Sequence, residues 1–487
     1  MSLLPDEPPL EAHEIQGHVL IGFGSAEQAI GAFTALDLEK LGQVLGGWAR
    51  KGRITSAYDL FPRKGISARR ALMLKVVPGP WIAAAVSHRL LGACGLAHDF
   101  GDDWFKVSTM AAVGELEDAR PAAGGAVGGD WVVGAPGTPV DVLLISAAGE
   151  IEAALELVDW FARDVGDAAQ LTYKEALHPI EGSKEHFGFR DGISQPGILG
   201  TVDEQPFEKE RQVDTGPIPY AKPGQQLVWP GEFVFGYAEQ GRVPKRPGRV
   251  AAMADEATNV VARNGSYLVF RRLEQNVARF RAFCEDQLEK HREQLGADFD
   301  VERLEASLVG RWPSGVPLAS PRTKPFDDAT ANDFDFDDDA MEHGCPAAAH
   351  IRKVNPRLLP MDQPTVPRLL RRGAPFGIQY DPNEDEPPER GRGLTFLAYM
   401  SSIQDQFGTI TTKWMNDGSR PTGGGHDMIA GQRGKWPRTF SLPAPSASSV
   451  LVQAEPGDAW VRTTGGAFLF APSISTLRAL AGPQEDA

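Results

Sequence analysis

Apolar residues in the first half of the chain follow two spacings, one typical of strands and one typical of helices. Apolar runs that predict strands begin at His18 (HVLIGFG), Ala71 (ALMLKVV) and Val140 (VDVLLISA). Amphipathic spacing of three and four residues predicts helices within residues 25–51 and 150–165. The first half is therefore predicted to be one β/α sandwich unit, in which helices cover a sheet.

The second half returns to this mixture after a stretch rich in proline and glycine at residues 200–231. A helix is expected from Glu274 to Leu295, because its apolar positions lie three or four residues apart and Gly296 can cap its end. A shorter helix is expected around residues 407–414. The predicted strands of this half begin at Glu232 (EFVFGY), Ser266 (SYLVFRRL), Gly393 (GLTFLAYMSSI) and Ala467 (AFLFAPSIS).

Two units that each mix antiparallel strands with covering helices predict an α+β fold made by duplication, although the halves share no clean sequence repeat. The first unit is assigned to residues 1–205 and the second to residues 231–487, with residues 206–230 as a linker. Long polar loops are expected at residues 121–138, 325–344 and 381–393.

Composition narrows the classes of partner. The chain has 487 residues, 42% of them hydrophobic and 23% charged, which is ordinary for a globular protein. Its net charge of -16 argues against nucleic acid or an anionic membrane as the main partner, since both attract basic surfaces. The first residues are acidic and proline-rich, unlike a secretory signal, and no apolar run is long enough to span a bilayer. We therefore expect a cytoplasmic protein.

The cysteines do not indicate a disulfide framework. Cys94, Cys284 and Cys345 are odd in number and far apart, which favours a reducing compartment. No CxxCH motif occurs, so covalent attachment of a c-type haem is excluded.

The stretch EHFGFRDGISQP at residues 185–196 is the most suggestive for chemistry. It holds Asp191 among glycines and phenylalanines, whose apolar rings would perturb the proton affinity of the carboxylate. Gly188 and Gly192 permit backbone conformations with positive φ. Asp191 is therefore a candidate general acid and base. The alternative is an ordinary turn, for which Asp-Gly is a common signal.

A second stretch, CPAAAHIRKVNPR at residues 345–357, places His350 after three alanines, whose small side chains would let a planar ring approach. A neutral imidazole is a common axial ligand of haem iron, and the cations Arg352, Lys353 and Arg357 could pair with the haem propionates. A hydrogen-bonded structural histidine is the alternative. Cys345 is a rival ligand, but the acidic loop before it disfavours the thiolate.

A third stretch, RLLRRGAPFGIQY at residues 368–380, brings Arg371 and Arg372 to an apolar turn. Arginine remains charged even when buried, so one of the two could stabilise negative charge that develops on a departing oxygen. Paired arginines at the surface are the alternative. Two other segments carry no prediction of a site: NDFDFDDDAMEH from Asn332 lacks the spacing of a calcium loop, and Gly423–Gly425 precedes His-Asp and not the Lys-Ser of a phosphate loop.

Taken together, these three stretches resemble the dye-decolorizing peroxidases, a family of haem proteins. GFRDG resembles the family's signature, which implies that Asp191 is the distal acid-base residue. AHIRKVNPR resembles the segment of the proximal ligand, His350. The pattern R-x-x-x-P-F-G resembles that of the distal arginine and selects Arg371 over Arg372. The resemblance extends through EIQGHVL from Glu14, PGEFVFGY from Pro230, NGSYLVFRRL from Asn264, NDFD from Asn332, GLTFLAYMSSIQDQF from Gly393 and APSIS from Ala471.

The resemblance implies two ferredoxin-like units, with one non-covalent haem b per chain held in the second. Arg352 and Arg357 would approach the propionates, and Gly192 the porphyrin face. Leu394 and Phe396 match positions that line the distal pocket, although ordinary strand core is the alternative. Asp405 is a candidate for the carboxylate that accepts the second imidazole N–H. Some members place an asparagine two residues after the distal arginine, and here that position is Gly373.

The implied activity is reduction of hydrogen peroxide and one-electron oxidation of dyes or small aromatic reductants, with an acidic pH optimum because an aspartate remains ionised in acid. Electrons could also enter from surface aromatics, with Tyr380, Tyr399 and Trp414 as candidates. A non-enzymatic haem-binding protein is the second hypothesis, and a sensor ligated by Cys345 is the third. The sequence leaves open whether the chain forms a homo-oligomer.

Overall fold

The fold is described from a computed structural model of the chain. It describes residues 10–483 except for 25, 61–79, 97–99, 108, 119–130, 199–210, 214–215, 219, 223, 238, 240–259, 321–324, 328–329, 335, 337–343, 358–365, 382–390, 433–435, 446 and 457–458. The strand expected at Ala71 lies outside the described residues. No helix among the described residues is long and apolar enough to cross a membrane.

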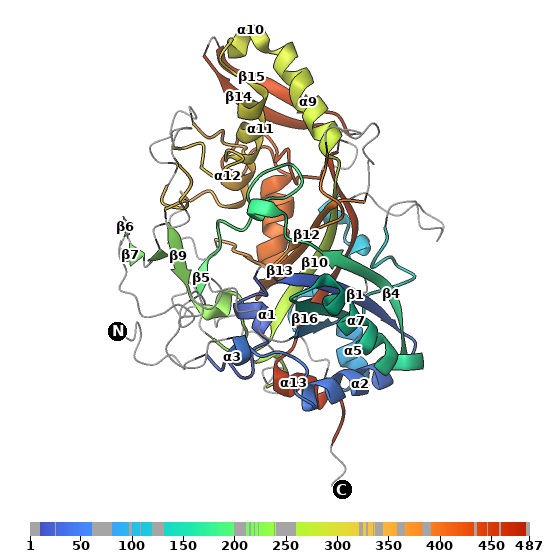
Figure 1. The fold of residues 1–487 in the computed structure, drawn as a ribbon. Coiled ribbons are helices and arrows are strands. Elements are labelled where there is room, and N and C mark those ends of the chain that lie inside the picture. Colours follow the sequence, from blue (N-terminus) through green and yellow to red (C-terminus); the bar gives the residue numbers. More distant parts are fainter. Residues whose placement is uncertain are drawn as a thin grey trace.

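One large antiparallel sheet organises the molecule (Figure 1). Within the described residues, nine strands run in the order β10-β16-β2-β3-β1-β4-β12-β13-β11, and β13 also pairs with β10, so that the sheet closes on itself. The strands are β1 (Glu27–Ala35), β2 (Trp81–Val86), β3 (Val142–Ala148), β4 (Ala169–Leu177), β10 (Ser266–Gln275), β11 (Leu370–Arg371), β12 (Ala374–Phe376), β13 (Gly393–Met400) and β16 (Val461–Ala471).

The strand order is the same in the two halves of the sheet. In the first half, β1, β2, β3 and β4 lie in the order β4-β1-β3-β2, with one helix after β1 and another after β3. In the second half, β10, β12, β13 and β16 lie in the equivalent order β16-β10-β13-β12. A single pair of residues joins the halves on each side, Val86 with Phe470 and Leu177 with Phe376.

Both faces of the sheet are buried, which explains the nearly continuous apolar runs of its strands. Side chains of a strand point alternately to opposite faces. In β3, Val142 and Leu144 therefore enter the core beneath helices α2 (Leu38–Arg50) and α7 (Ile151–Val165), whereas Leu143 and Ile145 enter the second core. Helix α2 is capped at its N-terminus by Asp37, whose carboxylate accepts the N–H of Lys40.

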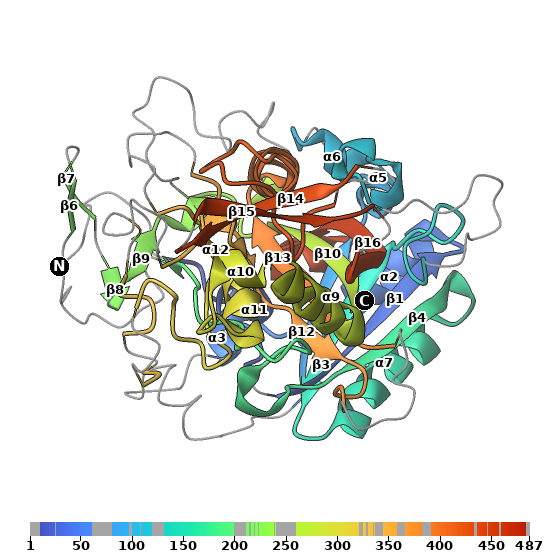
Figure 2. The same ribbon diagram turned by 90° about the horizontal axis from the view of Figure 1, so that it is seen from above.

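A second layer, the upper lobe, stands above the sheet in Figure 1 and faces the viewer in Figure 2. It has its own apolar core, which includes Phe187, Phe280, Trp460 and Cys345. Its elements are α9 (Val277–Lys290), α10 (Arg292–Leu295), α11 (Val301–Val309), α12 (His350–Val354), β14 (Arg438–Ala444) and β15 (Ala447–Ala454). The π-helix η6 (Ile403–Met415) contacts β13, β10 and α12.

The remaining elements are short. The helices are α1 (Gly17–Leu20), α3 (Ala57–Leu60), α5 (His88–Ala93), α6 (Asp103–Lys106), α13 (Ile474–Ala479), η1 (Met110–Ala112), η2 (Gly114–Leu116), η3 (Gly166–Ala168), η4 (Glu181–Ser183) and η5 (Pro230–Glu232); the strands are β5 (Gly197–Ile198), β6 (Arg211–Val213), β7 (Gly216–Ile218), β8 (Tyr220–Lys222) and β9 (Gln225–Val228).

The α+β class is confirmed in its coarse form, a mixed fold with a large antiparallel sheet. The strands predicted from Val140, Ser266, Gly393 and Ala467 are present, as is the helix capped by Gly296, which begins later than predicted and is divided into α9 and α10. The strand predicted from His18 is wrong, because residues 17–20 form the helix α1; all four are buried, so no period distinguishes the two structures.

Two further predictions are wrong for related reasons. A helix was predicted within residues 25–51 and α2 is present there, but the first part of this range forms the strand β1, which was not predicted. The segment from Glu232 is a 3₁₀ turn and bend, although Phe233, Val234 and Phe235 are buried as in a strand. Because all three side chains are buried, the sequence there is an apolar run that resembles a strand.

Candidate functional site

The loop at residues 184–196 is folded around the carboxylate of Glu185. This group accepts the backbone N–H groups of Phe187 and Phe189, each at 2.9 Å, and the Glu185 N–H donates to the Phe189 carbonyl. Gly188 has a φ of 99°, which favours glycine in this tight reversal. The fold of the loop leaves Asp191 at its far end, next to Gly192 with a φ of 74°.

Asp191 is paired with Arg371. The guanidinium Nη1 donates to the Asp191 Oδ1 at 2.8 Å, a charge-assisted hydrogen bond. Burial alone would raise the pKa of Asp191, but the charge and hydrogen bond of Arg371, the Gly192 N–H and the charge of His350 together lower this pKa below its usual value. Asp191 is therefore ionised at rest over most of the acidic range.

The position of Arg371 is set by its strand pairing and by hydrogen bonds to Gln195. In the pairing of β11 with β13, Arg371 lies opposite Ala398, so its side chain shares a face with Phe396 and Leu394. The Gln195 side chain accepts the Arg371 N–H at 3.2 Å and donates to the Arg371 carbonyl at 3.1 Å. The loop that carries Asp191 therefore also holds the backbone of its partner.

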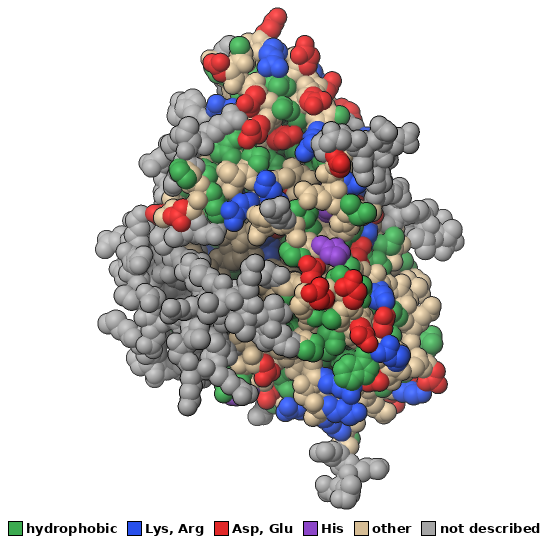
Figure 3. All heavy atoms as spheres, viewed as in Figure 1, with side chains coloured by type: hydrophobic (Ala, Val, Ile, Leu, Met, Phe, Trp, Pro, Cys, Tyr) green, Lys and Arg blue, Asp and Glu red, His purple; other side chains and the backbone are tan. Residues whose placement is uncertain are grey.

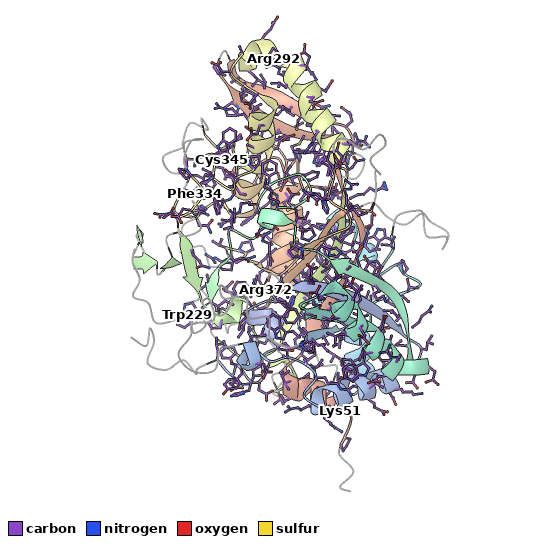
Figure 4. The ribbon with its side chains drawn as sticks, in the orientation of Figure 1. Lys51, Trp229, Arg292, Phe334, Cys345 and Arg372 are labelled. Atoms are coloured by element: carbon purple, nitrogen blue, oxygen red, sulfur yellow. The ribbon has the colours of Figure 1, made fainter. Side chains whose placement is uncertain are left out.

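Arg372 has a different partner set. Its guanidinium donates to the carbonyls of His18, Val19 and Leu20 at the end of α1. Figure 4 shows it beside the sheet, below the upper lobe. The structure thus brings Arg371, and not Arg372, to Asp191.

His350 is the first residue of α12 and is bound to a buried carboxylate. Its Nδ1 lies 2.7 Å from Oδ2 of Asp427, which is fully buried. The other Asp427 oxygen accepts the N–H groups of Ile429 at 2.8 Å and Ala430 at 3.0 Å. Burial alone would lower the pKa of His350, but the charge and hydrogen bond of Asp427 raise it above its usual value. Since Asp427 is itself ionised, with a lowered pKa, it accepts the Nδ1–H and leaves Nε2 as the free ring nitrogen.

The candidate carboxylate named from the sequence was wrong. Asp405 lies in the first turn of η6, and Asp427 occupies the place proposed for it. The missed signal was the glycine run before it: Gly424 would bring a Cβ within 2.9 Å of the Ala347 side chain, and Gly425 would bring one within 2.2 Å of a strand carbonyl. These glycines let the chain pass close beneath the segment that leads to His350.

Asp191, Arg371 and His350 lie near one another and are each partly accessible. The His350 side chain is 29% accessible and that of Asp191 37%, yet burial is the largest influence on the pKa of each. The two facts agree if both groups line a cavity inside the molecule. Their charges also reach one another, because each shifts the pKa of the other. On the face drawn in Figure 3, the surface is hollowed below the upper lobe, with Lys and Arg side chains at the upper edge.

The lining of this cavity fits a haem. Ala347, Ala348 and Ala349, which precede His350, are buried, and the last two pack in the core of the upper lobe. Among the described residues no hydrogen bond reaches the His350 Nε2. On β13, Leu394 and Phe396 are partly exposed while their neighbours are buried, as expected of side chains that face a cavity. A planar apolar ring with a metal at its centre would suit this set of donors and walls.

A group of neighbouring guanidiniums could receive the two acid groups of haem. Among the described residues, Arg311 meets only neutral acceptors: the carbonyls of Gly315 and Ala331 and the amide oxygen of Asn332. Burial first, and then the charges of Arg357 and Arg371, lower the pKa of Arg311 to about 10. Of these three guanidiniums, that of Arg371 is hydrogen-bonded to the carboxylate of Asp191.

Other residues proposed from the sequence have different surroundings. Arg352 is buried, donates to the Cys345 carbonyl and stacks on Phe336 at 4.7 Å. Arg357 donates to the carbonyls of Asn332 and Phe334. Cys345 is fully buried in the core of the upper lobe, where Figure 4 places it, and these surroundings do not favour it as a ligand.

Two of the three proposed surface aromatics are not at the surface. Tyr399 is 1% exposed and bonded to His18 Nδ1 at 2.8 Å, and Trp414 is 8% exposed. Only Tyr380 is half-buried, with the guanidiniums of Arg281 and Arg392 over its ring. The pattern of the sequence did not separate exposed from buried aromatics.

Comparison with known proteins gives one family. No family model matches the chain. Dye-decolorizing peroxidase msp1 of Mycetinis scorodonius is 28% identical over 500 residues, which cover 96% of this chain and 87% of the relative. Multifunctional dye peroxidase DyP2 of an Amycolatopsis species is 34% identical over 313 residues, 61% of each chain.

The solved structures agree. A variant of the dye-decolorizing peroxidase from Pleurotus ostreatus superposes with a TM-score of 0.80 at 25% identity, over 98% of this chain and all of that one. A dye-decolorizing peroxidase in complex with 2,6-dimethoxyphenol gives a TM-score of 0.75 at 26% identity, over 97% of this chain and all of that one. With its full-length likeness in sequence and in fold, the chain belongs to the dye-decolorizing peroxidase family of haem peroxidases.

Proposed function

We propose that the protein is a haem-dependent peroxidase that reduces hydrogen peroxide and oxidises dyes and phenols in one-electron steps, with Asp191 and Arg371 on the distal side and His350 as the iron ligand. One observation carries the proposal. The hydrogen-bonded pair Asp191–Arg371 lies near the hydrogen-bonded pair His350–Asp427, close enough that the charges of Asp191 and His350 shift each other's pKa. A ligand pair opposite an acid-base pair is the arrangement that peroxide cleavage requires.

On the proximal side, His350 would hold the iron through Nε2 while Asp427 fixes the ring and enriches it in electron density. Arg357, with Arg311 behind it, would offer positive charge to the acid groups of a non-covalent haem b. When bound, haem supplies the redox centre that delivers electrons to peroxide and later recovers them from reductant, one at a time.

On the distal side, Asp191 would take the proton from one peroxide oxygen and deliver it to the other, which leaves as water. Its lowered pKa keeps it ready to accept that proton in acid, which supports the expected acidic pH optimum. Arg371 would stabilise the negative charge on the departing oxygen. Leu394 and Phe396 would keep the cavity narrow, and Gly192 would allow close approach of the ring. Gly373 supplies no side-chain amide here.

The repeated strand order supports a duplicated architecture. We propose that residues 1–205 and 231–487 are two ferredoxin-like units joined by residues 206–230, with haem in the second. The β4-β1-β3-β2 order, with a helix after the first and third strands, is that of a ferredoxin-like unit, and the second half has the equivalent order.

A haem-binding protein without turnover is the second candidate. Such a protein needs the iron ligand and the cations but has no use for a distal acid-base pair. The hydrogen bond between Asp191 and Arg371 therefore favours the enzyme. Small phenols are proposed as reductants because one structural relative was solved with 2,6-dimethoxyphenol.

Reconstitution with haem tests the proposal. The loaded protein should give the absorption spectrum of a histidine-ligated ferric haem, change that spectrum rapidly on mixing with hydrogen peroxide, and return to it on addition of 2,6-dimethoxyphenol. His350→Ala should lose the ligation spectrum, whereas Asp191→Asn should keep it and react slowly with peroxide. A wild-type spectrum that does not respond to peroxide would contradict the peroxidase and leave the haem-binding candidate.

A further inference from the structure

Lys353 is a fully buried lysine one helical turn after His350. The sequence suggested that its ammonium could pair with a haem propionate, but in the structure the ammonium donates to the carbonyls of Asp417 and Arg420, the former at 2.8 Å. Both acceptors are neutral. Burial of an ammonium is costly unless an opposite charge offsets the cost, so a negative charge is expected near Lys353.

The two carbonyls belong to the segment that presents Asp427. Residues 416–427 leave the end of η6, pass through the glycine run and end at that carboxylate. The segment is held at two other points, where Thr422 Oγ1 donates to the Ala347 carbonyl at 2.7 Å and the Gly425 N–H donates to the Gly418 carbonyl at 3.0 Å. Helix α12 therefore carries two relevant side chains. His350 is the proposed iron ligand, and Lys353 binds the segment that presents Asp427, the hydrogen-bond partner of His350.

The charge of Lys353 is coupled to that of Asp427. Burial lowers the pKa of Lys353 to about 8, and the carboxylates of Asp427 and Asp417 oppose that decrease. The amine is thus mostly protonated at neutral pH and below. Asp427 is thus hydrogen-bonded to the imidazole of His350, and its negative charge also acts on the buried ammonium of Lys353.

We propose that Lys353 is a positioning residue that acts through Asp427, as the counter-charge that limits how strongly His350 donates electrons to haem iron. The inference rests on the proposed function, since it requires His350 to be the ligand. An uncompensated Asp427 would draw the Nδ1 proton more strongly and give the ring more imidazolate character, which stabilises ferric over ferrous iron. The ammonium reduces this effect and also holds the segment that positions the carboxylate, through the carbonyls of Asp417 and Arg420.

Neutral variants of Lys353 test the proposal in the haem-loaded protein. Lys353→Met removes the charge and the donors, while Lys353→Gln keeps two N–H donors for the carbonyls. Both should shift the ferric/ferrous midpoint potential to more negative values and raise the iron–histidine stretching frequency in resonance Raman spectra. Asp427→Asn should shift both quantities the opposite way. In the Asp427→Asn background, Lys353→Met should have a much smaller effect, because the partner through which it acts has lost its charge.

Thr422→Val is the matched control, because it removes another anchor of the same segment without changing charge. It should leave the potential and the stretching frequency near the wild-type values. The proposal is overturned by an unchanged potential in both lysine variants, by a shift as large in the Asp427→Asn background, or by an equal shift in Thr422→Val. A more positive potential in the lysine variants would also overturn it, since it would mean that the amine serves only to hold the segment.

Haem content and the ligation spectrum of each variant separate this inference from the proposed function. If the wild-type protein itself lacks histidine ligation, the proposed function fails. If ligation is normal and the potentials do not depend on Lys353, only the counter-charge fails. Circular dichroism of the haem-free variants shows whether either lysine variant has lost the fold, in which case Lys353→Gln or Lys353→Met, whichever folds, decides the outcome.

Discussion

Arg371 should control the acid limit of the peroxide reaction, because it is the main influence that lowers the pKa of Asp191. In Arg371→Gln the charge and the charge-assisted hydrogen bond at 2.8 Å are lost, while the burial of Asp191, which raises its pKa, remains. The pKa of Asp191 should therefore rise. Since only the ionised carboxylate accepts a proton from peroxide, the fall in rate on acidification should begin at a higher pH than in the wild type.

Two changes are expected in the same variant. Loss of the charge that stabilises the departing oxygen should reduce the second-order rate constant with peroxide by about 10²–10³-fold even at pH values where Asp191 is ionised. The acid limb should in addition move upward in pH. Stopped-flow absorbance of the haem-loaded protein, mixed with peroxide across the acidic and neutral range, measures both quantities in one series.

Arg372→Gln is the matched control. This neighbouring guanidinium holds the carbonyls at the end of α1 and does not contact Asp191. The variant should lose about 1–3 kcal/mol of stability, as expected for buried carbonyls left without donors, and should keep the wild-type acid limb. If Arg371→Gln slows the reaction but leaves the acid limb where it was, the electrostatic account of Asp191 is refuted.

Three further predictions concern the groups around this pair. Asp427→Asn keeps an acceptor for the His350 Nδ1–H but removes its charge, so the reduction potential of bound haem should rise, as spectroelectrochemistry would measure; an unchanged potential would contradict the assigned role. Gln195→Leu should slow the peroxide reaction by less than Arg371→Gln does, because it frees the Arg371 backbone without removing the charge; stopped-flow mixing would test this, and an equal loss would argue against simple positioning. Gly425→Ala should lower the melting temperature and the haem content together, since its Cβ would lie 2.2 Å from a strand carbonyl and its φ of 116° strains any other residue; wild-type values would refute the close approach.

The sequence pointed to Asp191, His350 and Arg371, which lie near one another in the structure, because each stands in a stretch of distinctive residue types. Asp191 lies between arginine and glycine, His350 follows three alanines, and Arg371 has a fixed spacing to Pro375 and Phe376. The choice of Arg371 over Arg372 came from the resemblance to the family's R-x-x-x-P-F-G pattern. The hydrogen bond between Asp191 and Arg371 then joins positions that are 180 residues apart.

Asp427 and Arg311 could not be found in the same way. Asp427 follows a run of glycines. The reason that glycine is needed there becomes visible only when the packing of the run against Ala347 is known. Arg311 follows α11 and becomes informative only through its neutral partners and its neighbouring cations. Both depend on tertiary contacts between distant segments, which no spacing along the chain encodes.

The same limit explains the errors in the fold. Residues 17–20 and 233–235 are buried on all sides, and uniform burial removes the periodicity that separates a helix or turn from a strand. The helix over residues 150–165 was predictable because only one of its faces is buried. Closure of the sheet depends on one residue pair at each junction, too little to leave a pattern in the sequence.

The central claim is that Asp191 moves the proton in peroxide cleavage at a haem held by His350. Single-turnover mixing of haem-loaded wild type and Asp191→Asn with hydrogen peroxide, followed by absorbance at equal haem content, tests it most directly. The asparagine keeps an oxygen to accept from Arg371 but cannot carry a proton, so the rate constant should fall by about 10²–10⁴-fold with the ferric spectrum unchanged. A variant that reacts with peroxide as fast as the wild type would contradict the claim.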